Sequence, residues 1–276
     1  MKEVLLDADR VLAGYDAVAR MYPFVPSLSH WRAWEYAAYQ RYRIAGSVLD
    51  LGCGDGQYFR LLWPDVRDVT GVDASEPVIE LARRSGVYTR VHHAFAHELP
   101  VADASADAVF ANCSLEHMDH LDQVLAEIRR CLVPGGTLLC SVVTDRFLSW
   151  SVLPMLVREA GGEALARQAL DQFIAYHHLV NPLTVGQWQR RFTEAGFTVE
   201  EHVPILPLYN SGLFLLADGA WHVKQGDGEL GDSLYRAFSA NPGFTAAFRL
   251  IVEGLLRMET DWRTGSGAVF AVRKAH

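Results

Sequence analysis

The chain has 276 residues, of which 50% are hydrophobic and 21% are charged, and its formal net charge at pH 7 is -8. This length can bury the core of one large domain or two small ones, and the composition is typical of a globular protein. The negative net charge argues against a broad nucleic-acid-binding surface, which needs a concentrated basic face.

Residues 7–43 are predicted to form two helices, because Pro23 and Pro26 interrupt an otherwise helical pattern. The segment is crowded with tyrosine and tryptophan side chains, among them Tyr15, and it precedes the first predicted strand. Packing of these helices against the sheet is one interpretation of the segment.

The stretch SVLDLGCGDGQYFR, residues 47–60, predicts a buried strand, a glycine-rich turn and the start of a helix. Its glycines remove side chains where a ligand would approach the backbone, and backbone donors at the helix start would face that ligand. The dinucleotide fingerprint GxGxxG fails here, because Gln57 and Phe59 stand where a third glycine is needed.

The sequence D-x-G-x-G-x-G in this stretch resembles motif I of the class I S-adenosylmethionine-dependent methyltransferases. A glycine-rich turn of another α/β protein is the alternative. The resemblance implies S-adenosyl-L-methionine as cofactor, with Asp50, Gly52, Gly54 and Gly56 in its site. GYDAVARMY resembles the segment that precedes the family's first strand, so residues 1–43 would form an N-terminal helical lid with Tyr15 facing the site.

A second strand, VTGVD, is predicted to end at Asp73, and a helix with Pro77 in its first turn and Gly86 at its end follows. An acid roughly 20 residues beyond the glycine turn can accept hydrogen bonds from ribose hydroxyls. We therefore expect Asp73 and the adjacent Ala74 to bind the cofactor, the alternative being a plain helix-terminal acid.

A third strand leads into AFAHELP, where the family carries D-A-E-x-L-P with an acid for the adenine amino group. HELP, residues 97–100, matches the end of that pattern, but Phe95 occupies the expected aspartate position. The resemblance then leaves Ala96 and His97 as the candidates to flank the adenine.

The fourth strand, DAVFAN, is predicted to end at Asn112, which we expect at the cofactor site. The following CSLEHMDHLDQVLAEIRRCLVPGG resembles the corresponding segment of the methyltransferase branch that includes quinone-biosynthesis enzymes, and TLLCSVV is a fifth strand. Strands and helices alternate up to this point, which is the pattern of a parallel, doubly wound sheet. The resemblance implies a Rossmann-like α/β core over residues 44–276, with a mostly parallel seven-stranded sheet.

Residues 145–180 read as helical, where the family inserts substrate-covering elements after the fifth strand. Thr184 and Gln187 form a capping-box signature for the next helix, and FTVEEHVPI is a sixth strand. A further helical segment spans about residues 210–262. GAVFAVRK would be the last strand, which family topology inserts antiparallel between the fifth and sixth.

Methyl transfer is an in-line displacement, so the protein chiefly supplies position, dehydration and a base for a protic acceptor. Base candidates are His117 and Glu116 after the fourth strand, and His177 or His178 near the end of the insertion. His117 has a structural role as its alternative. Neighbours on a helix point about 100° apart, so at most one of the pair His177 and His178 would face the pocket.

The predicted activity is S-adenosylmethionine-dependent methylation of a small molecule: a secondary metabolite, or a quinone-like, isoprenoid or sugar-derived acceptor. Two alternatives stay open, a non-methylating enzyme that binds the same cofactor and a non-catalytic partner protein. The four cysteines form no CxxC pair or zinc-type spacing, which predicts reduced thiols, a cytoplasmic protein and no bound metal. We expect no nucleic-acid partner, and no signal peptide or transmembrane helix, because apolar runs are short.

Overall fold

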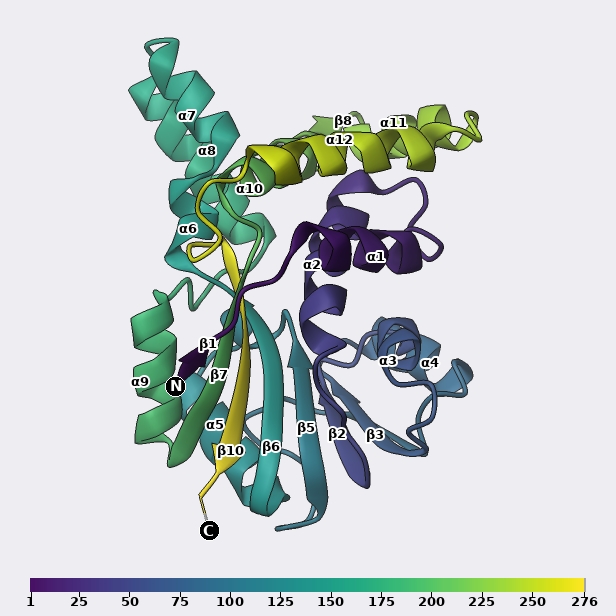
Figure 1. The fold of residues 1–276 in the computed structure, drawn as a ribbon, viewed down its shortest axis with the longest axis vertical. Coiled ribbons are helices and arrows are strands. Elements are labelled where there is room, and N and C mark those ends of the chain that lie inside the picture. The colour runs from purple at the N-terminus through teal and green to yellow at the C-terminus, as the bar shows by residue number, and fades with distance from the viewer. Residues whose placement is uncertain (276) are drawn as a thin grey trace.

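The computed structural model describes residues 1–275, which form one central sheet with helices on both faces and a helical layer above it (Figure 1). Eight strands make the sheet. In spatial order they are β1 (Lys2–Glu3), β7 (Phe197–Ile205), β10 (Gly267–Lys274), β6 (Leu132–Val143), β5 (Ala106–Asn112), β2 (Ser47–Leu51), β3 (Asp68–Asp73) and β4 (Arg90–His93).

Strand residues alternate between the two faces of the sheet, as the period of an extended chain requires. One face carries Val48 and Phe110 and shares a hydrophobic cluster with α2 (Pro26–Tyr39) and α3 (Gln57–Leu62), and α1 (Ala8–Val18) packs against α2. The other carries Leu49 and Val109 and packs against α5 (Leu121–Cys131) and α9 (Val185–Glu194). The chain between β3 and β4 forms α4 (Glu76–Arg84).

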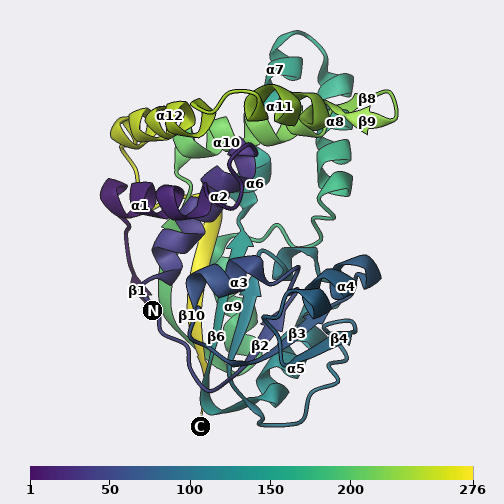
Figure 2. The ribbon, with the colours of Figure 1, turned by 90° about the vertical axis from the view of Figure 1, so that its right-hand side faces the viewer.

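A helical layer lies beyond the carboxyl ends of the parallel strands, with α1 and the start of α2 beneath it (Figure 2). Its elements are α6 (Asp145–Ser149), α7 (Val152–Glu159), α8 (Glu163–Tyr176), α10 (Leu208–Trp221), the hairpin β8 (Lys224–Gln225) and β9 (Gly228–Glu229), α11 (Leu230–Ser239) and α12 (Phe244–Met258). α10 begins two residues before the second predicted helical segment, about 210–262, and the other helices of the layer fall within that segment or within 145–180. No helix among residues 1–275 is long and apolar enough to cross a membrane.

The predicted doubly wound, mostly parallel sheet is confirmed. β2 pairs in parallel with β3 and β5, β5 pairs in parallel with β6, and β10 lies antiparallel between β6 and β7, as predicted. The strand count differs from the predicted seven because β1 adds a short parallel strand at the edge. Lys2 and Glu3 pair there with Glu201 and His202 of β7, and two residues are too few to give a sequence pattern.

Candidate functional site

The glycine turn after β2 adopts backbone angles that other residues rarely adopt. Gly52 has φ +72°, and its amide and that of Cys53 donate to Val72 O at 2.8 and 3.1 Å. A Cβ on Gly52 would lie 2.7 Å from Ser114 Cβ, so the turn passes too close to the residues after β5 for any side chain. Gly54 also has positive φ, +55°, but open space surrounds it.

Asp50 and Gly56 support this turn from behind. Tyr88 Oη donates to Asp50 Oδ2 at 2.7 Å and to Cys53 O at 2.9 Å. A Cβ on Gly56 would lie 2.6 Å from the Tyr88 ring. Asp50 is only 3% exposed, and this burial raises the pKa of its carboxyl to about 8. Asp50, Gly54 and Gly56 therefore shape the turn, and none of them lines the cavity in front of it.

The glycine-turn cavity, which we define by Gly52, Asp73, Phe95 and His117 in its walls, has a volume of about 460 Å³. Asp73 closes β3, and each of its carboxylate oxygens accepts one backbone amide: Gly54 N at 3.2 Å and Ser75 N at 2.9 Å. A carboxylate has about four lone-pair positions, so Asp73 keeps capacity for hydroxyl donors of a ligand.

The segment after β4 forms an aromatic wall of the same cavity. Phe95 is 64% exposed and stacks on His97, with ring centroids 5.6 Å apart and an interplanar angle of 21°. Ala74, Ala96 and His97 also line the cavity, and their role in cofactor binding stays a prediction. A large exposed aromatic face offers stacking to a planar ligand, and Phe95 stands where the family carries an acid.

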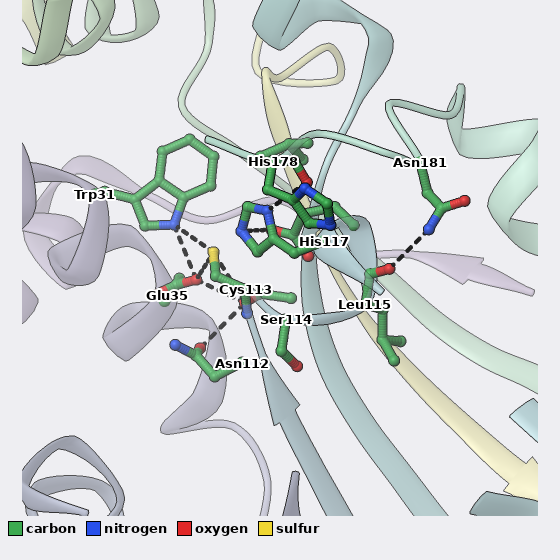
Figure 3. Close-up of polar contacts among 12 residues, drawn as sticks. Trp31, Glu35, Asn112, Cys113, Ser114, Leu115, His117, His178 and Asn181 are labelled. Atoms are coloured by element: carbon green, nitrogen blue, oxygen red, sulfur yellow. Dashed lines mark hydrogen bonds and ion pairs between the residues drawn. The ribbon is translucent and has the colours of Figure 1, made fainter. Parts of the chain in front are cut away.

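Asn112, by contrast, lies outside the cavity lining and beside a buried network around Glu35 of α2 (Figure 3). Glu35 Oε1 accepts from Trp31 Nε1 at 2.9 Å and Ser141 Oγ at 2.6 Å, and Arg32 pairs with Oε2 at 2.6 Å. The Asn112 amide is 3.1 Å from Ser141 Oγ. This network fixes α2 to the ends of β5 and β6, and sequence analysis missed Glu35 although Trp31 precedes it by one helical turn.

A second cavity, the aromatic cavity, adjoins the first and has a volume of about 270 Å³. The two cavities share Cys113 and His117 in their walls. Eight of its fifteen lining residues are apolar, and they come from α2 and the residue before it, β6, α6, the segment after α8, and α10: Val25, Leu28, Trp31, Val143, Phe147, Leu179, Phe214 and Trp221. Its polar lining residues are Ser27, Cys113, Glu116, His117, His177, Asp218 and His222.

Glu116 is fully buried in the wall of the aromatic cavity. Neither carboxyl oxygen has a hydrogen-bond partner among residues 1–275, and burial raises the pKa of the carboxyl to about 8. Its backbone is held firmly, since the amides of Val180 and Asn181 donate to Glu116 O at 3.0 and 2.9 Å. An unpaired carboxyl that titrates near neutral pH is suited to accept a proton.

His117 follows on the same 3₁₀ turn, Leu115–His117, and lies between the two cavities. Its Nε2 is 3.8 Å from Glu116 Oε1, and its Nδ1 is 3.3 Å from His178 O. Burial lowers the pKa of His117, which favours the neutral ring. Asn181 Nδ2 donates to Leu115 O at 3.1 Å, so the end of the insertion holds this turn in place (Figure 3).

The neighbours His177 and His178 face different cavities. His177 ends α8 and lines the aromatic cavity, whereas His178 lines the glycine-turn cavity with its side chain 65% exposed. The sequence analysis expected at most one of the two to face the pocket, whereas each lines one of the two adjoining cavities, because His178 leaves helical geometry at φ 46°. His177 Nε2 lies 2.9 Å from Asp218 Oδ2.

Asp218 of α10 and His222, the residue after this helix, were missed from the sequence. They stand one helical turn apart, and His222 Nε2 is 3.7 Å from Asp218 Oδ1. Burial raises the pKa of Asp218, but the contacts with His177 and His222 outweigh it and lower the pKa below its usual value. The i, i+4 spacing of an acid and a histidine was the available signal in the sequence.

Tyr15 lies away from both cavities. It is buried between α1 and α12, where its ring stacks on Phe248 and its hydroxyl donates to Thr245 O at 3.3 Å. Burial raises the pKa of this phenol to about 12. The α2 residues Trp31 and Leu28, rather than Tyr15, bring the N-terminal segment to the aromatic cavity.

Strained backbone concentrates around the glycine-turn cavity. Three non-glycine residues in its wall have positive φ: Cys113 at 46°, His120 at 56° and His178 at 46°. Such conformations persist where surrounding contacts enforce them, often at functional sites. Among residues 1–275, no group of three or more His, Cys, Asp or Glu side chains is arranged to hold a metal ion.

The chain was compared with known protein families and with individual proteins. Residues 49–140 match the family described as a methyltransferase domain. The chain is 32% identical over 147 residues to malonyl-acyl-carrier-protein O-methyltransferase of Xylella fastidiosa, covering 50% of this chain and only 50% of that protein's length. It is 28% identical over 223 residues to demethylmenaquinone methyltransferase of Symbiobacterium thermophilum, covering 70% of this chain and 84% of that protein.

Among solved structures, the fold resembles geranyl diphosphate methyltransferase in complex with SAM. The TM-score is 0.51 at 18% identity, and the match covers 84% of this chain and 79% of that chain. At this identity the likeness shows a shared fold.

Proposed function

Because residues 49–140 belong to the methyltransferase-domain family, we propose that the chain is an S-adenosylmethionine-dependent methyltransferase that acts on a small, largely apolar acceptor. The observation that carries the proposal is the pair of adjoining cavities, one beside the glycine turn and Asp73, the other lined by aromatic side chains. A methyl donor and its acceptor must meet in line at a shared boundary, and Cys113 and His117 form such a boundary.

The glycine-turn cavity suits S-adenosylmethionine in size and chemistry. Its volume of about 460 Å³ is within the range of small-molecule sites, Asp73 keeps free lone pairs for ribose hydroxyls, and Phe95 offers an exposed ring for the adenine. Gly52, which has no side chain, presents only backbone atoms where it lines the cavity. When bound, this cofactor supplies a methyl group already activated on a sulfonium.

The aromatic cavity favours quinone-like, isoprenoid or aromatic acceptors over sugar-derived ones. Eight of its fifteen lining residues carry Trp, Phe, Leu or Val side chains, which can pack against an aromatic ring or an isoprenoid chain. Its volume of about 270 Å³ fits a small molecule or one end of a larger one. The buried reduced thiols of Cys53, Cys131 and Cys140 support a cytoplasmic location as part of this proposal.

We assign Glu116 as the group that takes the acceptor's proton. Glu116 lines the aromatic cavity with an unpaired carboxyl, and a pKa of about 8 leaves roughly a tenth of it ionised at pH 7 and half at pH 8, so that it can act as a general base in this range. An acceptor O–H or N–H would lose its proton to a Glu116 oxygen as the new bond to carbon forms. His117, neutral and 3.8 Å away, would then help to stabilise or relay that proton.

The test is a conversion assay with the purified chain, S-adenosylmethionine and a panel of phenols, quinols and isoprenoid alcohols. Mass spectrometry should find a methylated product and an equal amount of S-adenosylhomocysteine. Conversion of an acceptor without S-adenosylhomocysteine would contradict methyl transfer and favour a non-methylating reaction on this fold.

A further inference from the structure

The aromatic cavity has acidic groups on two of its walls. Glu116 and Cys113 lie at the carboxyl end of β5, and Asp218 lies on α10. Trp31 connects them: its Nε1 is 3.1 Å from Cys113 Sγ, and its ring centroid is 4.9 Å from that of Phe214, one turn before Asp218. A ligand that reaches from one polar group to the other would therefore pass along aromatic faces.

Asp218 is buried without complete hydrogen bonding. It is 8% exposed, and its Oδ2 has no hydrogen-bond partner among residues 1–275. His177 Nε2, 2.9 Å away, is likewise buried and unpartnered, because the two atoms are close but not aligned for a hydrogen bond. Buried polar atoms are rarely left in this state, and both residues line the aromatic cavity.

Asp218, His177 and His222 form a cluster, and charged neighbours hold His222 in place. His222 Nδ1 is 2.9 Å from Glu229 Oε2, and Lys224 Nζ donates to Glu229 Oε1 at 3.0 Å. Burial lowers the pKa of His222, but contacts with Asp218 and Glu229 outweigh this and raise it. The lowered pKa of Asp218 keeps its carboxylate ionised, so the cluster presents a fixed hydrogen-bond acceptor to the cavity.

We propose that Asp218, positioned by His177 and His222, forms a distal subsite that binds a hydroxyl or amine group of the acceptor, away from the atom that is methylated. This inference rests on the proposed function and narrows its substrate class. The acceptor would be an aromatic or apolar molecule with two hydrogen-bond donors, one near Glu116 and one at Asp218.

The experiment measures binding of matched probes to the chain saturated with S-adenosylhomocysteine, by calorimetry. The pairs are hydroquinone against phenol, and para,para′-biphenol against para-phenylphenol, so that each pair differs by one donor and the two pairs differ in length. Para-aminophenol carries an amine in place of one hydroxyl of hydroquinone. The ratio of the two affinities shows whether the subsite prefers a hydroxyl or an amine.

We expect the two-donor member of at least one pair to bind about tenfold tighter or more, which is typical of a hydrogen bond to a charged group. Asp218→Asn keeps the shape but removes the charge, and it should reduce this preference to about threefold or less. Asp171→Asn, at an exposed carboxylate on α8, is the matched control and should leave the preference unchanged.

Equal binding of both members of each pair, or an unchanged preference in Asp218→Asn, overturns the subsite. Failure of every probe to bind the saturated wild-type chain overturns it too. If Asp218 were merely structural, its variant would lose thermal stability without a change in the ratio of affinities. Failure of the wild-type chain to bind S-adenosylhomocysteine at all would instead refute the proposed function.

Discussion

The glycine-turn cavity and the aromatic cavity differ in how their walls are distributed along the chain. The first is built from the carboxyl ends of neighbouring parallel strands, so Gly52, Asp73 and Phe95 come from short consecutive segments. The second combines α2, the turn after β5, the end of the insertion and α10, which lie up to about two hundred residues apart.

This difference separates what the fold fixes from what the individual chain adds. Strand ends of a doubly wound sheet meet at one edge whatever the intervening helices are, so a ligand site there needs only a glycine turn and an acid. Helices outside the sheet have no such constraint. The identity of the acceptor should therefore depend on α2, α8 and α10, and changes in the two cavities should have separable effects.

The largest effect should come from Glu116→Gln in the aromatic cavity. Loss of the base should lower kcat by about 10²–10⁴-fold, while the affinity for S-adenosylhomocysteine stays within about threefold of wild type. Steady-state assays with a saturating acceptor from the panel measure kcat, and calorimetry measures the affinity for S-adenosylhomocysteine. Glu159→Gln, at the exposed end of α7, is the control, and an equal loss of kcat there would contradict the assignment.

In the glycine-turn cavity, Gly52→Ala should nearly abolish binding of S-adenosylhomocysteine. The new Cβ would lie 2.7 Å from Ser114 Cβ at φ +72°, so the turn must shift. Gly54→Ala is the matched control, because Gly54 has positive φ but open space around it, and strain alone costs about 1–2 kcal/mol. Calorimetry and thermal denaturation of both variants test this, and equal losses would show that the close approach is unimportant.

A smaller effect on the same cavity is expected for Phe95→Ala. Stacking of a base on an aromatic ring contributes about 1–3 kcal/mol, so affinity for S-adenosylhomocysteine should fall by about 5–150-fold. Because Phe95 is 64% exposed, the free energy of unfolding should change little. A loss of stability without a loss of affinity would mean that the ring packs rather than binds.

The smallest expected effect concerns stability and pH. The pKa of Glu116 in the folded chain, about 8, is above the usual 4.5, so its contribution to stability is present below about pH 4.5 and is lost as pH rises through 8. Glu116→Gln removes this loss, and the variant should gain stability relative to wild type between about pH 5 and pH 8. Asp50 also has a pKa raised to about 8, so it makes the free energy of unfolding depend on pH in the same way in wild type and in the variant. Urea denaturation across this pH range measures the free energy of unfolding of both proteins. A difference between them that does not change with pH would refute the assigned pKa.

The sequence predicted the sheet well because its signals are local. Alternating strands and helices, the glycine turn and the capping box at Thr184 each follow from short-range rules, and the capping box is present as predicted. The extra strand β1 was missed because its pairing depends on the neighbouring edge of β7. The pairing of two residues at a sheet edge depends on the tertiary structure and not on the local sequence.

The site was predicted in part for the same reason. Asp73 lines the glycine-turn cavity because it closes a strand, and its role in binding stays a prediction. Asn112 also closes a strand, but Ser141 and Glu35 draw its side chain into the network under α2, which no local pattern indicates. The i, i+4 spacing of Asp218 and His222 was visible in the sequence, but the cavity that Asp218 lines depends on how α10 packs against α2 and α7.

The most direct test of the central claim, that the glycine-turn cavity holds the methyl donor, is calorimetric titration of S-adenosylhomocysteine into wild type and Asp73→Asn. Loss of a charge-assisted hydrogen bond should weaken binding by about 1.5–3 kcal/mol, or roughly 10–100-fold, whereas Asp65→Asn at an exposed turn should bind like wild type. Wild-type affinity in Asp73→Asn, or no binding by the wild-type chain, would contradict the account.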